Sequence, residues 1–176
     1  MKELDTERVR IVPLDAESLR LFIDDICKLQ DVFHLEKSEL LLDEEIKDAM
    51  KYRLSKVLID SSNYYWHTNW LIISKELNSI IGGIMLKGLP DENGEVIIGY
   101  FTFPFYQRKG YMTEAIKILA SWILGQPYVK RVIADTEKEN KASHKVLEKN
   151  GARLYKETED LYFWELSKKT MNLHIE

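Results

Sequence analysis

Residues Gly99 to Ala115 read GYFTFPFYQRKGYMTEA and change period within the stretch. The first half is apolar and aromatic and predicts a strand, whereas the apolar residues after Gly110 recur at helical spacing. The first N–H groups of a helix lack partners within it and lie at the positive end of its dipole. A phosphate placed there accepts several of these N–H groups, and Arg108 and Lys109 add positive charge beside it. The stretch therefore predicts a phosphate-binding loop; the alternative is a basic loop that binds nothing.

The rest of the chain alternates between the same two periods. Asp15 is placed to cap an early helix, and the apolar spacing over 38–58 predicts a second one. Helices thus come early, consecutive antiparallel strands occupy the middle, and strands alternate with helices at the end, which predicts a mixed α+β sheet. The expected strands are 8–14, 69–74, 79–87, 96–103, 131–135, 154–156 and 161–166, with further helices after Gly110 and over 141–149.

The composition is that of a folded, water-soluble protein. With 176 residues, 45% of them apolar and 31% charged, the chain is expected to form one domain over 1–176 and to be ordered. Its 25 basic and 29 acidic residues give a formal net charge of −4, which argues against a nucleic-acid partner and makes any anion site a local one. No apolar run is long enough to cross a bilayer, and residues 1–5 lack the apolar core of a signal peptide. We therefore expect a cytoplasmic protein without a membrane partner.

Cysteine and histidine usage does not predict a metal site. The single cysteine, Cys27, cannot form an internal disulfide or a thiolate cage, and on an amphipathic helix it is expected to be a small buried side chain. His34 and His174 have no partners at metal-ligand spacing, and His144 is expected at the surface. The sequence therefore predicts that no metal is bound.

Two blocks of the sequence resemble a known family. Residues 107–112, QRKGYM, are similar to the Gln/Arg-x-x-Gly-x-Gly/Ala signature of GNAT N-acetyltransferases, with Met112 where the signature has Gly or Ala. The surrounding run is similar to the branch that contains the ribosomal-protein N-terminal acetyltransferases RimJ and RimL, and a second block, ENKAS at 139–143 with VLEKNGA at 146–152, strengthens the match. The resemblance implies a mostly antiparallel sheet splayed at the cofactor site. It also implies direct transfer of acetyl from acetyl-CoA to a primary amine, either a protein N-terminus or a small molecule. The sequence leaves open whether the chain is a monomer or a homodimer.

The resemblance further implies where acetyl-CoA is held. In the family the signature loop binds the pyrophosphate, and two neighbouring strands separate so that backbone groups pair with the pantetheine amides. A backbone N–H near Thr102 or Phe103 is the natural donor to the thioester oxyanion. Asn140 would lie beside the pantetheine arm, and it is also placed to cap the following helix. The implied acetyl-CoA residues are Phe101, Thr102, Phe103, Gln107, Arg108, Lys109, Gly110, Tyr111, Met112, Thr113, Asn140 and Ser143.

Two departures from the family concern the acid and the base. Leu147 stands where many members have a tyrosine proposed to protonate the leaving thiolate, and Ile97 stands where close relatives have a glutamate. Strand alternation puts Glu95 on the same face as Ile97, so Glu95 is the candidate general base; the alternative is a solvated carboxylate beside a turn. Ser143 is the candidate proton donor to the thiolate, with a helix-surface serine as the alternative.

The helix over 38–58 is expected to pack in the core, although GNAT enzymes usually build substrate pockets from this region. The acidic start at 43–45 could attract a cationic amine, although helix starts favour acids in any case. The aromatic residues at 64–66 and Trp70 are expected to line a substrate pocket or to pack in the core. The rival to an enzyme is a non-catalytic acyl-CoA-binding sensor or partner protein of the same fold, which would bind acetyl-CoA without turnover.

Overall fold

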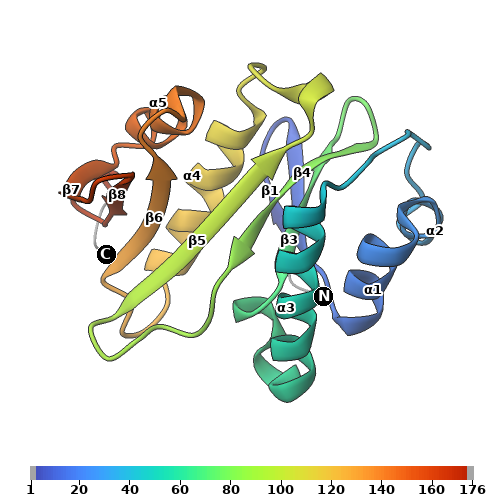
Figure 1. The fold of residues 1–176 in the computed structure, drawn as a ribbon, viewed down its shortest axis with the longest axis horizontal. Coiled ribbons are helices and arrows are strands. Elements are labelled where there is room, and N and C mark those ends of the chain that lie inside the picture. Colours follow the sequence, from blue (N-terminus) through green and yellow to red (C-terminus); the bar gives the residue numbers. More distant parts are fainter. Residues whose placement is uncertain (1–2, 174–176) are drawn as a thin grey trace.

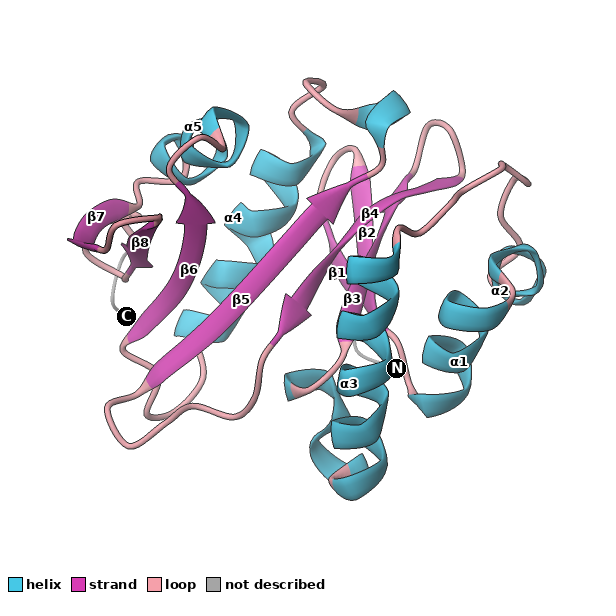
Figure 2. Ribbon diagram, viewed as in Figure 1, coloured by secondary structure: helices cyan, strands magenta, loops and turns pink. Residues whose placement is uncertain are grey.

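The structure, a computed structural model, describes residues 3–173 and is built around one open sheet (Figures 1 and 2). Its strands follow the spatial order β1-β2-β3-β4-β5-β6-β8-β7, and every neighbouring pair is antiparallel except β5 and β6. The mixed, mostly antiparallel sheet predicted from the sequence is thereby confirmed. The strands are β1 (Leu4–Asp5), β2 (Val9–Pro13), β3 (Asn69–Ser74), β4 (Ser79–Leu86), β5 (Glu95–Thr102), β6 (Arg131–Glu137), β7 (Arg153–Glu157) and β8 (Leu161–Leu166).

Helices cover both faces of the sheet. Helix α4 lies behind the sheet in the view of Figure 2, and α3 lies in front of it with α1 and α2 beside it. Helix α5 lies next to the end of β6. The helices are α1 (Ala16–Asp24), α2 (Ile26–Val32), α3 (Glu44–Ile59), α4 (Tyr111–Leu124) and α5 (Lys141–Lys149), with 3-10 turns η1 (Ser61–Trp66) and η2 (Pro104–Tyr106). None of the helices in residues 3–173 is long and apolar enough to span a membrane.

The parallel pair β5–β6 separates part of the way along. The two strands are paired from Glu95 with Arg131 to Ile98 with Ala134. Beyond this point β5 stays paired with β4 as far as Thr102, and β6 stays paired with β8 as far as Glu137. Figure 1 shows the two strands diverging toward η2 and α5. The splayed sheet implied by the resemblance is therefore present.

Helix α4 is anchored by its apolar face, which packs on the sheet. Ala115, Ile116, Leu119 and Ile123 follow helical spacing and are all buried. The helix starts at Gly110, whose φ of +82° lies in the left-handed region that a residue with a Cβ rarely adopts. This glycine turns the chain from β5 and η2 into α4, as the sequence predicts.

Some element boundaries and burials differ from the predictions. The helix expected from residue 38 begins at Glu44, because Asp43 caps it: Asp43 Oδ1 accepts a hydrogen bond from the Ile46 N–H at 2.8 Å. Cys27 is exposed, so the prediction of a buried side chain was wrong. His144 is buried against the rings of Tyr162 and Trp164, so its predicted surface position was wrong as well. The aromatic cluster packs in the core: Trp66 and Trp70 stack on Trp122. His174 lies outside the described residues.

Candidate active site

A cavity of about 580 Å³ opens where β5 and β6 separate. We call it the central cavity. It is bounded by α3 on one side and by the start of α5 on the other, with strand residues forming its floor. Its lining residues are Glu45, Ala49, Tyr52, Arg53, Met85, Lys87, Gly99, Tyr100, Asp135, Thr136, Glu137, Asn140, Ser143 and Leu161. Among the predicted site residues, Asn140 and Ser143 line this cavity.

Unpaired peptide groups of β5 face the side that β6 has left. The carbonyl of Ile97 accepts from the N–H of Lys87, and the N–H of Phe103 donates to the carbonyl of Ile81, so these residues are paired with β4. Because peptide groups alternate between the two sides of a strand, those of Tyr100 and Thr102 are directed toward the gap. Of the two oxyanion donors considered from the sequence, Thr102 therefore faces the gap, whereas the N–H of Phe103 is occupied by Ile81.

The two predicted residues that line the cavity, Asn140 and Ser143, lie at the start of α5. The side-chain oxygen of Asn140 accepts from the Ser143 N–H at 3.1 Å, so Asn140 caps the helix. The hydroxyl of Tyr100 donates to the Ser143 carbonyl at 3.3 Å and so links β5 to α5 across the gap. Burial raises the pKa of Tyr100 to about 12, so its phenol stays protonated to a higher pH than that of an exposed tyrosine. Leu147, at the position where many family members have a tyrosine, is fully buried.

The signature loop lies at the wide end of the gap, between η2 and α4. Arg108, Lys109 and Gly110 are exposed, and the chain passes through left-handed conformations at Arg108, with φ +61°, and at Gly110. Gln107 anchors the loop by donating from Nε2 to the Thr102 carbonyl at 3.1 Å. The side chains of Tyr111 and Met112 are buried, so these two residues present backbone N–H groups at the start of the helix. Thr113 follows in the same first turn of α4.

Phe101 occupies a different environment from the other predicted cofactor residues. Its ring packs between Phe22 of α1 and Phe103, with centroid distances of 6.3 and 5.6 Å. This side chain therefore joins α1 to β5.

The signature loop is held from the other end of the chain by Arg8. Its Nη1 donates to the Lys109 carbonyl at 3.2 Å, and its Nε donates to Oε2 of Glu114 at 2.7 Å. Thr6 donates a further hydrogen bond to the Glu114 carboxylate. Burial raises the pKa of Glu114, but the hydrogen bonds from Thr6 and Arg8 outweigh burial and hold the pKa below its usual value. The sequence offers no local pattern for this clamp because its partners lie more than a hundred residues apart.

A second ion pair crosses the floor of the central cavity. Lys87, just after β4, places Nζ 3.3 Å from Oδ1 of Asp135 on β6. Gly99 lies beneath the lysine: a Cβ at this glycine would be 3.5 Å from Lys87 Cε. Asp135 is the first β6 residue beyond the paired segment, so its carboxylate lies at the narrow end of the gap.

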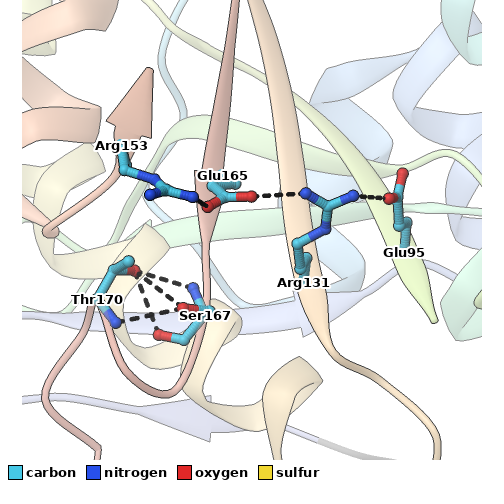
Figure 3. Close-up of polar contacts among 6 residues, drawn as sticks. All are labelled: Glu95, Arg131, Arg153, Glu165, Ser167 and Thr170. Atoms are coloured by element: carbon cyan, nitrogen blue, oxygen red, sulfur yellow. Dashed lines mark hydrogen bonds and ion pairs between the residues drawn. The ribbon is translucent and has the colours of Figure 1, made fainter. Parts of the chain in front are cut away.

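Glu95 lies outside the central cavity, at the paired end of β5. Its carboxylate forms an ion pair with Arg131, which also binds Oε2 of Glu165 at 2.6 Å. Arg153 binds the other oxygen of Glu165 at 2.5 Å, so one row of charges crosses β5, β6, β8 and β7 (Figure 3). Glu95 is about 13 Å along the strand from Gly99, at roughly 3.3 Å per residue. The structure thus brings Asn140, Ser143 and the unpaired face of β5 together and leaves Glu95 apart.

Helix α3 packs on the core through buried residues such as Met50 and Val57, as expected, and it also supplies the wall of the cavity opposite α5. Glu45, Tyr52 and Arg53 line the central cavity from this helix. Within residues 3–173, no group of three or more His, Cys, Asp or Glu side chains could hold a metal ion.

Comparison with known proteins assigns the chain to a family. The family model described as "Acetyltransferase (GNAT) domain" matches residues 8–153. An uncharacterized N-acetyltransferase of Bacillus subtilis, YjdG, is 31% identical over 168 residues, which cover 92% of this chain and 95% of YjdG.

Solved structures share the fold. The ribosomal-protein-S5-alanine acetyltransferase from Vibrio fischeri superposes with a TM-score of 0.70 at 18% identity, covering 95% of this chain and 97% of that one. RimL, a ribosomal L7/L12 α-N-protein acetyltransferase, in complex with coenzyme A superposes with a TM-score of 0.68 at 14% identity, covering 94% and 98%. Together with the splayed sheet and the signature loop at the start of α4, these matches show that the chain belongs to the GNAT family of acetyl-CoA-dependent N-acetyltransferases.

Proposed function

We propose that this chain transfers the acetyl group of acetyl-CoA directly to a primary amine bound in the central cavity. The observation that carries the proposal is the position of the cavity: it opens at the separation of β5 and β6, whose wide end holds the signature loop. In the transfer, the amine nitrogen attacks the thioester carbonyl carbon, the C–S bond breaks, a base takes the proton from nitrogen and the thiolate leaves. No acyl-enzyme intermediate is formed.

Groups at the two ends of the gap between β5 and β6 would bind acetyl-CoA. The exposed N–H groups at the start of α4 and the charges of Arg108 and Lys109 suit the pyrophosphate. The N–H groups of Tyr100 and Thr102 and the carbonyl of Tyr100 suit the pantetheine amides and the thioester oxygen, because a buried amide needs a partner, whereas the Thr102 carbonyl is already bound by Gln107. With the phosphates at the wide end, the thioester extends toward the narrow end, where Asp135 lies.

Two carboxylates compete for the role of general base. An ordinary lysine-like amine has a pKa of about 10.4, so a base must take its proton at neutral pH directly or through water. The sequence favours Glu95, by alternation from Ile97. The geometry favours Asp135, because it lines the central cavity whereas Glu95 lies outside it. Each carboxylate is paired with a cation, Asp135 with Lys87 and Glu95 with Arg131, so the position alone separates them. We propose Asp135 as the base and retain Glu95 as the alternative to be tested beside it.

The leaving thiolate has two candidate hydrogen-bond donors. Ser143, the candidate from the sequence, lines the cavity at the first turn of α5. Tyr100 also lines the cavity, and its phenol is protonated at neutral pH. A thiol of ordinary pKa, near 8.5, leaves without full protonation, so a hydrogen bond from either hydroxyl is sufficient. We propose Tyr100 as the principal donor: its phenol lies in the gap, and its one hydroxyl proton would turn from the Ser143 carbonyl to the departing thiolate.

The acceptor is a protein N-terminus or a small-molecule amine. The two solved relatives named above act on ribosomal proteins according to their names, and a protein α-amine near pKa 8 loses its proton more readily than a lysine. We propose that the reaction takes place in the cytoplasm, where acetyl-CoA is the available donor.

The test is release of free CoA thiol from acetyl-CoA, followed with a panel of α-amines, lysine side-chain amines and small amines. Release that depends on one class of amine, with acetylated product identified by mass, supports the transfer. Tight acetyl-CoA binding without release on any amine contradicts it and supports the alternative, a non-catalytic acyl-CoA-binding sensor or partner protein.

A further inference from the structure

Arg53 is a buried cation in the wall of the central cavity. Its exposed fraction is 8%, and it is the one arginine in residues 3–173 that is buried. Its Nη1 donates to the Leu86 carbonyl at 3.3 Å, and its guanidinium lies 4.6 Å from the centre of the Tyr52 ring. A guanidinium has five N–H donors, so most of its donor capacity is unused by the protein.

The other basic residue that lines the cavity is neutralised, but Arg53 is not. Lys87 is paired with Asp135. No described carboxylate forms an ion pair with Arg53. Burying an unpaired charge is costly, and a ligand carboxylate with two oxygens would satisfy the fork of N–H donors that remains.

The central cavity also contains negatively charged side chains. Glu45 and Glu137 line it, are exposed and form no ion pair with a described residue. These carboxylates suit the ammonium form of an arriving amine, whereas Arg53 repels it. The cavity is therefore complementary to a molecule that carries both charges.

We propose that the acceptor amine also carries a carboxylate, which Arg53 binds. The proposal rests on the proposed acetyl transfer and narrows its substrate class. The carboxylate is either the α-carboxylate of a free amino acid or an acidic side chain at the N-terminus of a peptide; both present the same planar anion to the guanidinium.

The test compares matched acids and amides by equilibrium titration into the chain saturated with CoA. One pair is alanine and alaninamide; the other is a dipeptide amide that begins with aspartate and the same dipeptide beginning with asparagine. We expect the acid of one pair to bind at least about tenfold more tightly than its amide. A difference between alanine and alaninamide identifies the α-carboxylate of a free amino acid as the ligand, and a difference between the two dipeptide amides identifies the acidic side chain. Equal affinities in both pairs, or no binding by any probe, overturn the proposal.

Variants assign the preference to Arg53. Arg53→Gln should remove the preference for the acid and leave acetyl-CoA affinity unchanged, whereas Arg20→Gln, at an exposed arginine of α1, should retain the preference. Arg53→Lys keeps the charge without the fork and should weaken binding of the acid several-fold but not of the amide. This variant decides the matter if Arg53→Gln does not fold. A preference that survives in both Arg53 variants overturns the proposal.

Measuring the release of free CoA thiol alongside binding distinguishes failure of the carboxylate site from failure of the proposed acetyl transfer. Binding of acids through Arg53 without thiol release contradicts acetyl transfer and leaves the carboxylate site standing. Acetylation of amines without preference for acids, in either binding or rate, contradicts the carboxylate site and leaves acetyl transfer standing.

Discussion

The Lys87 ammonium crosses over Gly99 to reach the Asp135 carboxylate, with Nζ 3.3 Å from Oδ1. The lysine follows β4 and the aspartate lies on β6, so the pair spans the strand between them. A glycine in that strand leaves room for the lysine stem. The floor of the central cavity therefore depends on a small residue at position 99.

Two substitutions at Gly99, one by a small and one by a large side chain, test whether the cavity floor requires a small residue there. A Cβ there would lie 3.5 Å from both Lys87 Cε and Met85 Cε, which is ordinary contact, so Gly99→Ala should keep activity within about threefold of the wild type. Gly99→Leu extends into the space of the lysine and the acceptor, and should lower kcat/KM for the amine at least about tenfold. Steady-state kinetics with the amine varied provide the measurement. Equal rates for the two variants would show that residue 99 does not border the acceptor.

Asp135→Asn should lower turnover about a hundredfold and leave the Kd for acetyl-CoA unchanged, because it removes the proton acceptor but keeps a polar group of the same size. Glu95→Gln is the matched comparison and should stay within about threefold, because Glu95 lies outside the cavity and contributes through its ion pair with Arg131. Single-turnover rates at saturating acetyl-CoA separate chemistry from binding. A loss of tenfold or more in Glu95→Gln with none in Asp135→Asn would assign the base to Glu95.

Glu114→Gln should weaken acetyl-CoA binding, because Arg8 would lose the charged partner that fixes it against the Lys109 carbonyl. We expect the KM for acetyl-CoA to rise several-fold and the free energy of unfolding to fall by about 1.5–3 kcal/mol, the range for hydrogen bonds to a charged group.

The same variant should change the acid stability. The native pKa of Glu114 lies below its usual value, so its charge stabilises the fold above the unfolded pKa and is lost as the pH falls through the native pKa. Denaturant unfolding from pH 6 to pH 3 should therefore show a smaller fall in stability for Glu114→Gln than for the wild type. Identical pH profiles would exclude this role.

Tyr100→Phe should lower kcat about tenfold with little change in KM for acetyl-CoA, because it removes the hydroxyl and keeps the ring. The alkaline stability gives a readout independent of rate. Burial raises the pKa of Tyr100 to about 12, so the native state keeps its proton while the unfolded state loses it near pH 10. Stability should fall between about pH 10 and 12 in the wild type and fall less in the variant. An unchanged kcat would assign the hydrogen bond to another group, such as Ser143.

The sequence predicted the elements whose periodicity is local and strong. The cap at Asp15 is confirmed by its hydrogen bond from the Ser18 N–H at 2.8 Å, and the helix that follows Gly110 lies where its apolar spacing predicts. The start of α3 was placed too early, because Leu40 and Leu42 pack against the core from an extended segment and not from a helix. Periodicity alone does not separate these two ways of burying a leucine.

The site residues also fall into two groups: those that lie in a local sequence pattern and those that only the fold brings together. Residues of the signature loop and the cap at Asn140 are contiguous in sequence and were identified from it. Arg53 lies on α3, Lys87 directly after β4 and Asp135 on β6, and they meet only because the fold brings these elements together. A single sequence contains no spacing that pairs them, and only the fold shows that Glu95, two residues from Ile97, lies outside the cavity.

Calorimetric titration of acetyl-CoA into the wild-type chain and into Gly110→Val tests the central claim most directly. Valine cannot readily adopt the φ of +82° at residue 110, and its Cβ would lie 3.4 Å from Arg8 Nη2, so the loop could not keep its shape. Gly88→Val is the matched control, since Gly88 also has a positive φ but lies away from the loop. We predict a Kd in the micromolar range, about −8 kcal/mol, for the wild type and for Gly88→Val, and no measurable binding by a folded Gly110→Val. A folded wild-type chain that does not bind acetyl-CoA, or a Gly110→Val variant that binds as tightly, would contradict the account.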